Sequence, residues 1–224
     1  MGAEPAGWPA VGLYEGRPRP YHDGARSSIC KAPIECAVWL GESGLEADEQ
    51  ADRVHHGGPD RALCHYPAEH LGFWRERLPE SADVFVPGML GENLSTHGLA
   101  EADVAVGDVF RLGDAVLQIT QPRQPCWKVN RRCGVDDLSR RMVAARRTGW
   151  LYRVLEPGWV APGAVLHRAD VAAGAPSLTA LWDITLDADA TAELLRDAAA
   201  APALAAAWQL RLTSRADWLA RKRR

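Results

Sequence analysis

The sequence has no long hydrophobic run. Its most apolar stretch extends from Ala198 to Trp208, but this stretch is mostly alanine, contains Pro202 and is too short to span a bilayer. At the N-terminus no basic segment precedes an apolar core, and Ala6 stands where a myristoylation signal requires Ser or Thr. These absences predict a soluble, cytoplasmic protein without a membrane anchor.

Cysteine is scarce and irregularly spaced. The chain has 5 cysteines in 224 residues, an odd number that does not suit a secreted disulfide framework and fits a reducing compartment. A zinc template is also missing, because Cys126 and Cys133 are too far apart for a paired-cysteine half-site and the Cys64-His65 pair has no matching partner. The five cysteines are Cys30, Cys36, Cys64, Cys126 and Cys133.

Nucleotide-binding signatures are missing as well. The chain has neither a Walker loop nor a Gly-x-Gly-x-x-Gly motif behind a strand. If it performs redox chemistry, we expect its electrons to come from another protein or from a small donor. A formal net charge of −3 argues against a general nucleic-acid binder, and the basic run at 221–224 is typical of a solvated helix end.

The chain does contain enough apolar residues, 47%, to bury a full core and to add a small second unit. From Val11 to about Arg168, short runs broken by Gly, Pro and Asp predict a strand meander or barrel. A linker-like segment at 172–176 separates this β-rich domain, residues 1–171, from an alanine-rich helical domain, residues 177–224. Strands are predicted at 35–40, 61–65, 104–106, 109–112, 115–120, 150–155 and 164–167.

Two helices are predicted to interrupt these strands. Pro67 is well placed as the first residue of one helix, because proline is favoured in a first helical turn. Asp136 or Asp137 is predicted to cap the other. The apolar faces are formed by Leu71, Trp74 and Leu78 in the first helix and by Leu138 and Met142 in the second.

Three further helices are predicted after the linker. Leu204, Trp208 and Leu212 form an apolar stripe on the longest of them. Because short helices are marginal alone, we expect all three to bury their apolar faces against the β domain and to roof a pocket there. Their predicted ranges are about 178–182, 189–199 and 202–222.

Cys126 is the candidate functional residue with the most informative surroundings. Pro122 and Pro125 stiffen the segment that follows a predicted strand, so the thiol is held in one direction. Arg123 and Lys128 are close enough in sequence to favour the thiolate, which attacks electrophiles or binds a soft metal. A buried structural cysteine is the alternative, and the prolines and cations favour the functional interpretation.

A second candidate segment begins at the paired glycines Gly57 and Gly58. Such a pair lets the backbone turn sharply and approach a ligand, and Arg61 can make bidentate contacts with a phosphate or carboxylate. With His56 and Arg61 on either side, the segment is a candidate anion site, although a plain strand-to-turn junction gives the same glycine pattern. His55 and His56 face opposite sides of an extended chain, so they cannot both reach one metal.

Two other segments carry weaker signals. The acidic segment 44–52 could hold a general acid or base, with a solvated loop as the alternative interpretation. Asn93 precedes a predicted strand, and its amide could hold the edge of a heteroaromatic ring.

These polar segments occur in a fixed order along the chain. Together they resemble MOSC-domain proteins of the YiiM type, and the resemblance covers nearly the whole chain, including the C-terminal three-helix unit. Ala47 stands where that family commonly has glycine. The segments that carry the resemblance are 45–50, 56–66, 91–94, 107–108, 121–128 and 149–152.

The resemblance implies a mixed β-barrel with peripheral helices and a small C-terminal three-helix domain. It implies the molybdenum cofactor, or molybdopterin, and a detoxifying oxidoreductase that reduces N-hydroxylated bases such as 6-hydroxylaminopurine. It also brings a family-level association with pyridoxal phosphate binding. The implied partners are a small N-hydroxylated substrate and a separate electron-donor protein, with no membrane and no specific nucleic acid; homodimer formation is left open.

The resemblance also implies roles for individual residues. Cys126 would be the catalytic thiolate and molybdenum ligand, which agrees with its cation-flanked setting. Glu46 is the candidate proton donor, because N-hydroxyl reduction consumes two protons and releases water; a metal-bound water is an alternative. The residues expected to bind the cofactor are His56, Gly57, Gly58, Arg61, Asn93, Arg123 and Lys128.

Two other functions are compatible with the sequence. A carrier or sulfur-transfer module would bind the cofactor without reducing a substrate; the absence of an attached pyridoxal-phosphate desulfurase domain and the helical unit favour a stand-alone enzyme. A metal-free cysteine enzyme would need a base beside Cys126, for which His55, His56 and His167 are the candidates.

Overall fold

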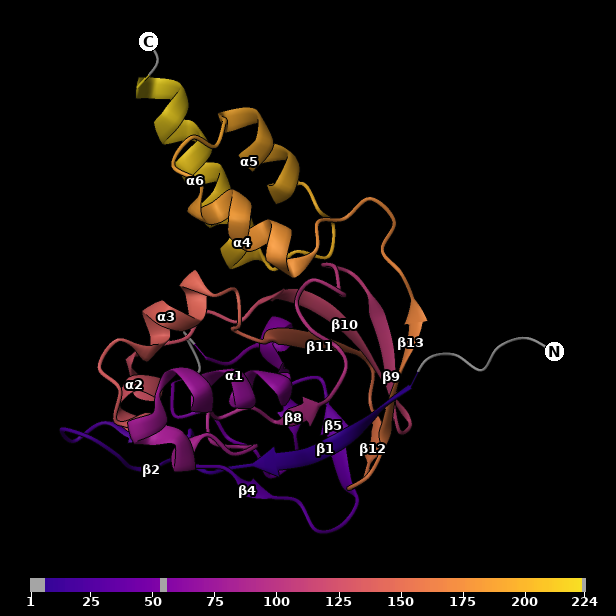
Figure 1. The fold of residues 1–224 in the computed structure, drawn as a ribbon. Coiled ribbons are helices and arrows are strands. Elements are labelled where there is room, and N and C mark those ends of the chain that lie inside the picture. The colour runs from indigo at the N-terminus through magenta and orange to yellow at the C-terminus, as the bar shows by residue number, and fades with distance from the viewer. Residues whose placement is uncertain (1–6, 53–55, 223–224) are drawn as a thin grey trace.

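A closed, mixed β-barrel forms the body of the molecule (Figure 1). The computed structural model describes residues 7–52 and 56–222. Within these ranges seven strands pair in a ring, antiparallel except for one parallel contact at His65 and Leu94. An additional short strand, β4 (Ala32–Pro33), extends the sheet. The ring runs through β13 (Val165–Asp170), β9 (Val109–Leu112), β10 (Ala115–Pro122), β11 (Trp150–Glu156), β7 (Leu63–His65), β8 (Leu94–Thr96) and β1 (Gly7–Glu15), and closes where β1 pairs with β13.

Smaller elements surround the barrel. A three-stranded sheet and a two-stranded ribbon lie outside the ring, and helices fill the connections between its strands. The small sheets comprise β12 (Gly158–Val160), β5 (Val38–Gly41) and β6 (Gly44–Leu45), and β2 (Arg19–Pro20) with β3 (Arg26–Ser27). The helices in the β-rich part are η1 (Pro59–Arg61), α1 (Glu69–Arg77), η2 (Pro79–Val84), α2 (Trp127–Cys133) and α3 (Leu138–Ala144).

The C-terminal helices pack on one end of the barrel (Figure 1). They are α4 (Leu178–Leu186), α5 (Ala192–Ala199) and α6 (Ala206–Lys222). Their buried residues belong to the same hydrophobic cluster as the barrel interior, and the indoles of Trp182 and Trp208 meet edge to face at 5.0 Å between ring centroids. The prediction that these helices bury their apolar faces against the β domain is therefore confirmed. Because this core is continuous, the division at 171–177 stays a prediction about domains.

A second hydrophobic cluster lies beneath α1, α2 and α3. It confirms the predicted faces of two helices, since Leu71, Trp74 and Leu78 are buried with Leu138 and Met142. Helix α1 begins at Glu69, however, two residues after the predicted Pro67, and Asp137 stands at the N-cap of α3 without a side-chain capping hydrogen bond.

Several strand predictions are correct in position, and others need correction. The hairpin of β9 and β10 around Gly113 is confirmed, as is β11. The predicted strand at 104–106 is wrong: Ala105 makes only an isolated bridge to Ser177, and its N–H donates to the Asp108 carboxylate in a turn. The predicted strand at 61–65 begins only at Leu63, because Arg61 closes a 3-10 turn.

Among the residues described, no helix combines the length and the apolar character needed to cross a membrane. All five cysteines are unpaired. Their degree of burial differs, from the exposed Cys36 to the buried Cys133, so they are not equivalent chemically.

Candidate functional site

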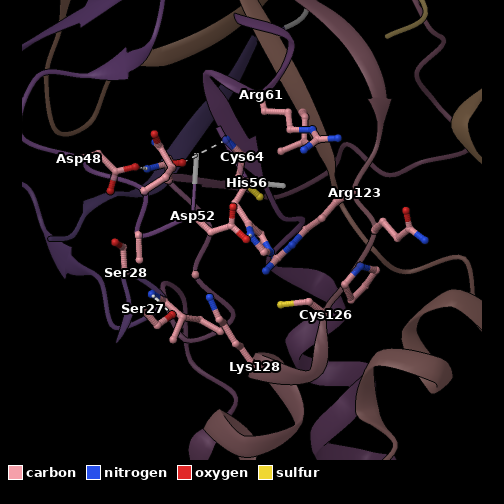
Figure 2. A pocket seen from close by; sticks show the side chains of 18 of the residues that line it. Ser27, Ser28, Asp48, Asp52, His56, Arg61, Cys64, Arg123, Cys126 and Lys128 are labelled. Atoms are coloured by element: carbon pink, nitrogen blue, oxygen red, sulfur yellow. Dashed lines mark hydrogen bonds and ion pairs between the residues drawn. The ribbon is translucent and has the colours of Figure 1, made fainter. Parts of the chain in front are cut away.

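A cavity of about 750 Å³ lies between the barrel and helix α6. Segments far apart in the sequence line it: the loop before β4, the acidic segment after β6, the start of β7, the end of β10, the start of α2 and the first turns of α6. Figure 2 shows the side chains of Cys126, Arg123 and His56 turned toward one another in this cavity. The expected pocket between the barrel and the C-terminal helices is present.

Cys126 is positioned by the end of strand β10 and the start of helix α2. Strand β10 continues to Pro122, and Cys126 is the N-cap of α2 in an extended conformation, with φ −106° and ψ 172°. Its side chain makes no capping hydrogen bond. Cys126 is one of the residues that line the cavity. The preceding prolines hold this entry to the helix, as predicted, but the seven-residue helix that follows was not predicted.

Arg123 lines the same cavity as the thiol and is anchored by hydrogen bonds. Its backbone N–H donates to the carbonyl of Gly149 at 2.9 Å, and Nη2 donates to the carbonyl of Leu90. Gly149 must be glycine here, because its φ is +71° and a Cβ would lie 2.1 Å from the carbonyl oxygen of His65. The buried Nη1 of Arg123 has no hydrogen-bond partner among the described residues, so this guanidinium retains a donor for a ligand.

Positive charge dominates the cavity. Five lysines or arginines line it against three carboxylates among the described residues. One pair is already satisfied: Lys31 and Asp48 form a buried ion pair, and Asp48 also accepts from the backbone N–H of Gly16 at 2.7 Å. The cations are Lys31, Arg61, Arg123, Lys128 and Arg211, and the carboxylates are Asp48, Glu49 and Asp52. A cavity with this balance is suited to an anionic ligand.

His56 is the titratable group of the cavity whose usual pKa is closest to neutral. Its Nδ1 lies 3.7 Å from Oδ2 of Asp52, and its backbone N–H donates to the carbonyl of the same residue at 3.0 Å. Burial and the nearby charge of Lys128 lower the pKa of His56, and Asp52 raises it in part. The imidazole is therefore mostly neutral at pH 7 and able to accept and pass on a proton.

A second thiol, Cys64 on β7, also lines the cavity (Figure 2). Burial is the main cause that raises the pKa of the Cys64 thiol, so this thiol stays protonated. Its backbone N–H donates to Oδ1 of Asn93 at 3.1 Å, and the carbonyl of Cys64 accepts from the Asn93 N–H at 2.8 Å. Because the metal-binding form is the thiolate, these properties favour Cys126 over Cys64 as a ligand.

Asn93 lines the cavity but its side chain is engaged by the protein. Its amide nitrogen donates to the Tyr14 carbonyl at 3.1 Å and to Oδ2 of Asp48 at 3.0 Å, while its oxygen accepts from Cys64. Both amide protons are therefore used. The geometry gives Asn93 a supporting position behind Cys64 and Asp48.

The remaining predicted site residues do not line the main cavity, apart from those already described. Glu46 is exposed and does not line the cavity, although Asp48 and Glu49 do, so its role as proton donor stays a prediction without support from the pocket. Gly57 and Gly58 line a smaller adjoining cavity. His167 lies on β13, where a Cβ on Gly7 would contact its ring, and is not in the lining. His55 lies outside the described residues.

The sequence analysis did not single out several of the lining residues, among them Lys31, Gln121 and Arg211. Lys31 meets Asp48 of the acidic segment through tertiary folding, and no local pattern indicates their pairing. Arg211 comes from α6, one turn after Trp208, so the predicted apolar stripe could have indicated that its neighbours face the barrel. Burial and Arg215 lower the pKa of Arg211, and its guanidinium lies 5.4 Å from the Trp208 ring centroid.

The fold and the cavity together define a closed β-barrel with a cation-rich cavity beside the Cys126 thiol. A family model for the MOSC domain matches residues 52–167. The chain is 42% identical over 191 residues to Protein YiiM of Escherichia coli (strain K12), covering 84% of this chain and 85% of that protein. The chain therefore belongs to the MOSC-domain family, as the sequence motifs predicted.

Solved structures and a further relative agree with this assignment. The crystal structure of YiiM from Escherichia coli superposes with a TM-score of 0.80 at 33% identity, covering 96% of this chain and 94% of that chain. The predicted fold class, a mixed β-barrel with peripheral helices and a C-terminal three-helix unit, is thus confirmed. A protein named Reductase from Gibberella moniliformis is 36% identical over 138 residues, but the matched part is 24% of its length.

Proposed function

We propose that this protein is a molybdenum-cofactor-dependent reductase of N-hydroxylated bases such as 6-hydroxylaminopurine, with a detoxifying role. The observation that carries the proposal is the meeting of the Cys126 thiol with an excess of cations in one cavity of about 750 Å³. Membership of the MOSC-domain family supports the cofactor, since MOSC domains in general bind it. The relative named Reductase supports the reaction type.

The residues present fit the cofactor. Buried atoms of three lining residues lack a hydrogen-bond partner within the described chain: Oγ of Ser28, Oε1 of Gln121 and Nη1 of Arg123. A buried polar atom without a partner costs free energy, so such atoms indicate a ligand that completes them. A pterin ring offers donors and acceptors for them, and Arg123, Lys128 and Arg61 offer charge to its phosphate.

Cys126 and the cations would hold the cofactor in this proposal. The thiolate of Cys126 is a soft ligand of the kind that molybdenum prefers. Arg123 is fixed through both its backbone and Nη2, so it can hold an anionic group without further ordering. When bound, the cofactor supplies the two electrons that break the N–O bond.

The chain supplies protons for the reaction and a surface for the substrate. Reduction of the N-hydroxyl group takes up two protons and releases water, so a proton carrier near the metal is required. His56 with Asp52 meets this requirement better than Glu46, because both line the cavity. Trp127 follows the thiol, is 46% exposed and lines the same cavity, so its indole can stack on a planar base.

The electrons would come from outside the chain, from a separate donor protein or from a small donor, because the sequence carries no dinucleotide-binding motif. The cavity lies between the barrel and α6.

The test is production in a host able to make molybdenum cofactor. We expect about one molybdenum per chain by metal analysis and reduction of 6-hydroxylaminopurine with an artificial electron donor. Molybdenum without turnover of N-hydroxylated compounds would favour the carrier or sulfur-transfer function. Turnover without molybdenum would contradict the cofactor assignment and favour a metal-free cysteine enzyme with His56 as its base.

A further inference from the structure

Helix α6 has an exposed face that carries both apolar and basic side chains. Leu210 is 68% exposed and Trp218 is 50% exposed, although both are large hydrophobic residues. At about 100° of rotation per residue, both fall within the same third of the helix circumference. The residues that define this exposed α6 face are Ala207, Leu210, Arg211, Trp218, Arg221 and Lys222, all of them exposed.

The opposite side of α6 holds the helix in the molecule. Trp208, Leu212 and Ala216 lie there and are buried in the same hydrophobic cluster as the barrel interior. A single exposed apolar residue is ordinary on a protein surface. Two large ones in register along a helix, with basic residues beside them, indicate a surface that contacts another molecule.

The exposed α6 face begins at the main cavity. Ala207 and Arg211 belong to this face and also line the cavity. Trp218 follows Arg211 by seven residues, which is about 10 Å along the helix axis. From the cavity, α6 leads away from the barrel toward the C-terminus (Figure 1). A protein bound to the exposed α6 face would therefore lie beside the space that Cys126 lines.

The exposed α6 face has an excess of positive charge. Residues 206–224 contain six lysines or arginines and one carboxylate, in a chain whose formal net charge is −3. That carboxylate, Asp217, is paired with Arg196 of α5 at 2.9 Å, and Arg215 donates to carbonyl groups at the end of α4. The cations that have no ion-pair partner among the described residues are Arg211, Arg221 and Lys222.

The apolar and basic side chains of this face are combined in one arrangement. Nζ of Lys222 lies 4.6 Å from the ring centroid of Trp218, so an exposed indole is flanked by a positive charge. A solvated basic helix end needs no apolar side chains, whereas tryptophan and arginine are enriched where proteins bind one another. The face therefore fits a protein partner with acidic side chains around an apolar centre.

We propose that the exposed α6 face is the docking surface for an electron-donor protein whose own surface is acidic. This inference rests on the proposed function, in which electrons enter from outside the chain. Two electrons from the donor and two protons convert R–NHOH to R–NH2 and water, so the donor is oxidised as the substrate is reduced. The location favours a donor protein over an anionic membrane, because the electrons are required in the adjoining cavity.

The test uses the holoenzyme and a reduced plant-type [2Fe–2S] ferredoxin, an acidic one-electron carrier, as the probe. Turnover of 6-hydroxylaminopurine is measured against ferredoxin concentration at low ionic strength. Reduced methyl viologen serves as a small donor that needs no docking surface. One variant reverses two charges, Arg221→Glu with Lys222→Glu, and a second is Leu210→Glu. The control reverses two exposed charges on other elements, Arg77→Glu with Arg111→Glu.

We expect the charge-reversal variant of α6 to raise KM for ferredoxin by about tenfold or more, because repulsion replaces attraction. Leu210→Glu should raise it by about fivefold, and the control should stay within about twofold. The rate with methyl viologen should stay within about twofold in all variants. Added salt should raise KM in the parent and change it little in the charge-reversal variant. Equal KM values in the α6 variants and the control would overturn the docking surface.

Failure of the docking surface and failure of the proposed function give different results. Turnover with methyl viologen but none with ferredoxin in the parent contradicts the docking surface alone. Absence of turnover with both donors contradicts the proposed reaction. Titration calorimetry with oxidised ferredoxin then tests the surface separately, and binding that the charge-reversal variant loses supports it.

Two other occupants of the exposed α6 face are distinguished by further measurements. Sedimentation with phosphatidylserine vesicles detects an anionic membrane contact, and light scattering detects a second copy of the chain. Vesicle binding without ferredoxin binding would overturn the proposal in favour of a membrane. Self-association that Leu210→Glu abolishes, without ferredoxin binding, would overturn it in favour of a dimer.

Discussion

The buried residue His65 is expected to make the stability of the folded protein depend on pH. His65 is fully buried on β7, where Nδ1 lies 3.1 Å from the Tyr152 hydroxyl and Nε2 lies 2.9 Å from Oγ1 of Thr96. Burial, with a smaller contribution from His70, lowers the pKa of His65 to about 3. The folded state therefore keeps this imidazole neutral at pH values where the unfolded chain protonates it.

The expected consequence is a loss of stability in mild acid. With an unfolded pKa near 6.5 and a folded pKa of about 3, the unfolded state binds more protons within this window, so stability falls as pH decreases through it. The contribution reaches about 1.4 kcal/mol per pH unit. Urea unfolding at pH 7.5 and 5 should show a steeper loss for the parent than for His65→Gln; parallel losses would refute the assignment.

Substitutions of His56 and Glu46 distinguish the two candidate proton carriers. We expect His56→Gln to reduce turnover by about a hundredfold, as for loss of a general acid or base, with molybdenum content near that of the parent. Glu46→Gln is the matched control, because Glu46 is exposed outside the cavity lining. If Glu46→Gln loses turnover and His56→Gln does not, the proton passes through the acidic loop.

The sequence was informative about single residues only where local chemistry defines them. The prolines around Cys126 correctly indicated that the chain leaves the sheet before the thiol, which stands at the N-cap of α2 after strand β10. The roles of Cys64 and Asn93 depend on hydrogen bonds between β7 and the segment before β8, 29 residues apart. Contacts of that range are set by tertiary packing, which no local pattern shows.

At the scale of elements, the loop before β11 connects the helical unit to the cavity. The carboxylate of Glu101 accepts from the N–H groups of Thr148 and Gly149, each at 2.7 Å, and contacts Nε2 of His70 at 2.6 Å. Trp182 of α4 donates to Oγ1 of Thr148 at 3.0 Å. Because the Gly149 carbonyl holds the backbone of Arg123, this network positions the cavity wall.

Glu101→Ala should therefore be strongly destabilising. It leaves buried N–H groups and His70 without their acceptor, at a cost of about 3 kcal/mol or more. The unfolding midpoint in urea measures this loss, with the exposed Glu42→Ala as control. Equal midpoints for the two variants would show that the network contributes nothing.

Element predictions succeeded where a face is periodic and failed where packing defines the element. The faces of α1, α3 and α6 were visible as apolar spacing. Helix α2, which has seven residues and buries Val129 and Cys133, was missed, although Gly134, with φ 67°, is a typical helix-ending signal. Residues 104–106 alternate like a strand but form a turn, because Asp108 accepts from the Ala105 N–H.

At the scale of the whole molecule, the ordered motifs predicted the family and the barrel, and they could not show the cavity. The cavity depends on α6 lying across the end of β10, where the Ala205 N–H meets the Thr120 carbonyl at 3.1 Å. The position of α6 places Arg211 in the lining of the cavity together with Cys126, which lies 85 residues earlier in the chain. Such an arrangement follows from the packing of α4, α5 and α6 on the barrel core.

In the proposed function, the Cys126 thiolate binds molybdenum in this cavity. The most direct measurement is the molybdenum content of Cys126→Ser, with Cys64→Ser and Cys133→Ser as controls, all produced in a host that makes the cofactor. Burial raises the pKa of Cys133 to about 11 and that of Cys64 above its usual value, so neither thiol should act as the ligand. The account predicts that Cys126→Ser alone loses molybdenum and turnover while keeping the parent's unfolding midpoint. Equal molybdenum content in all three variants would contradict it.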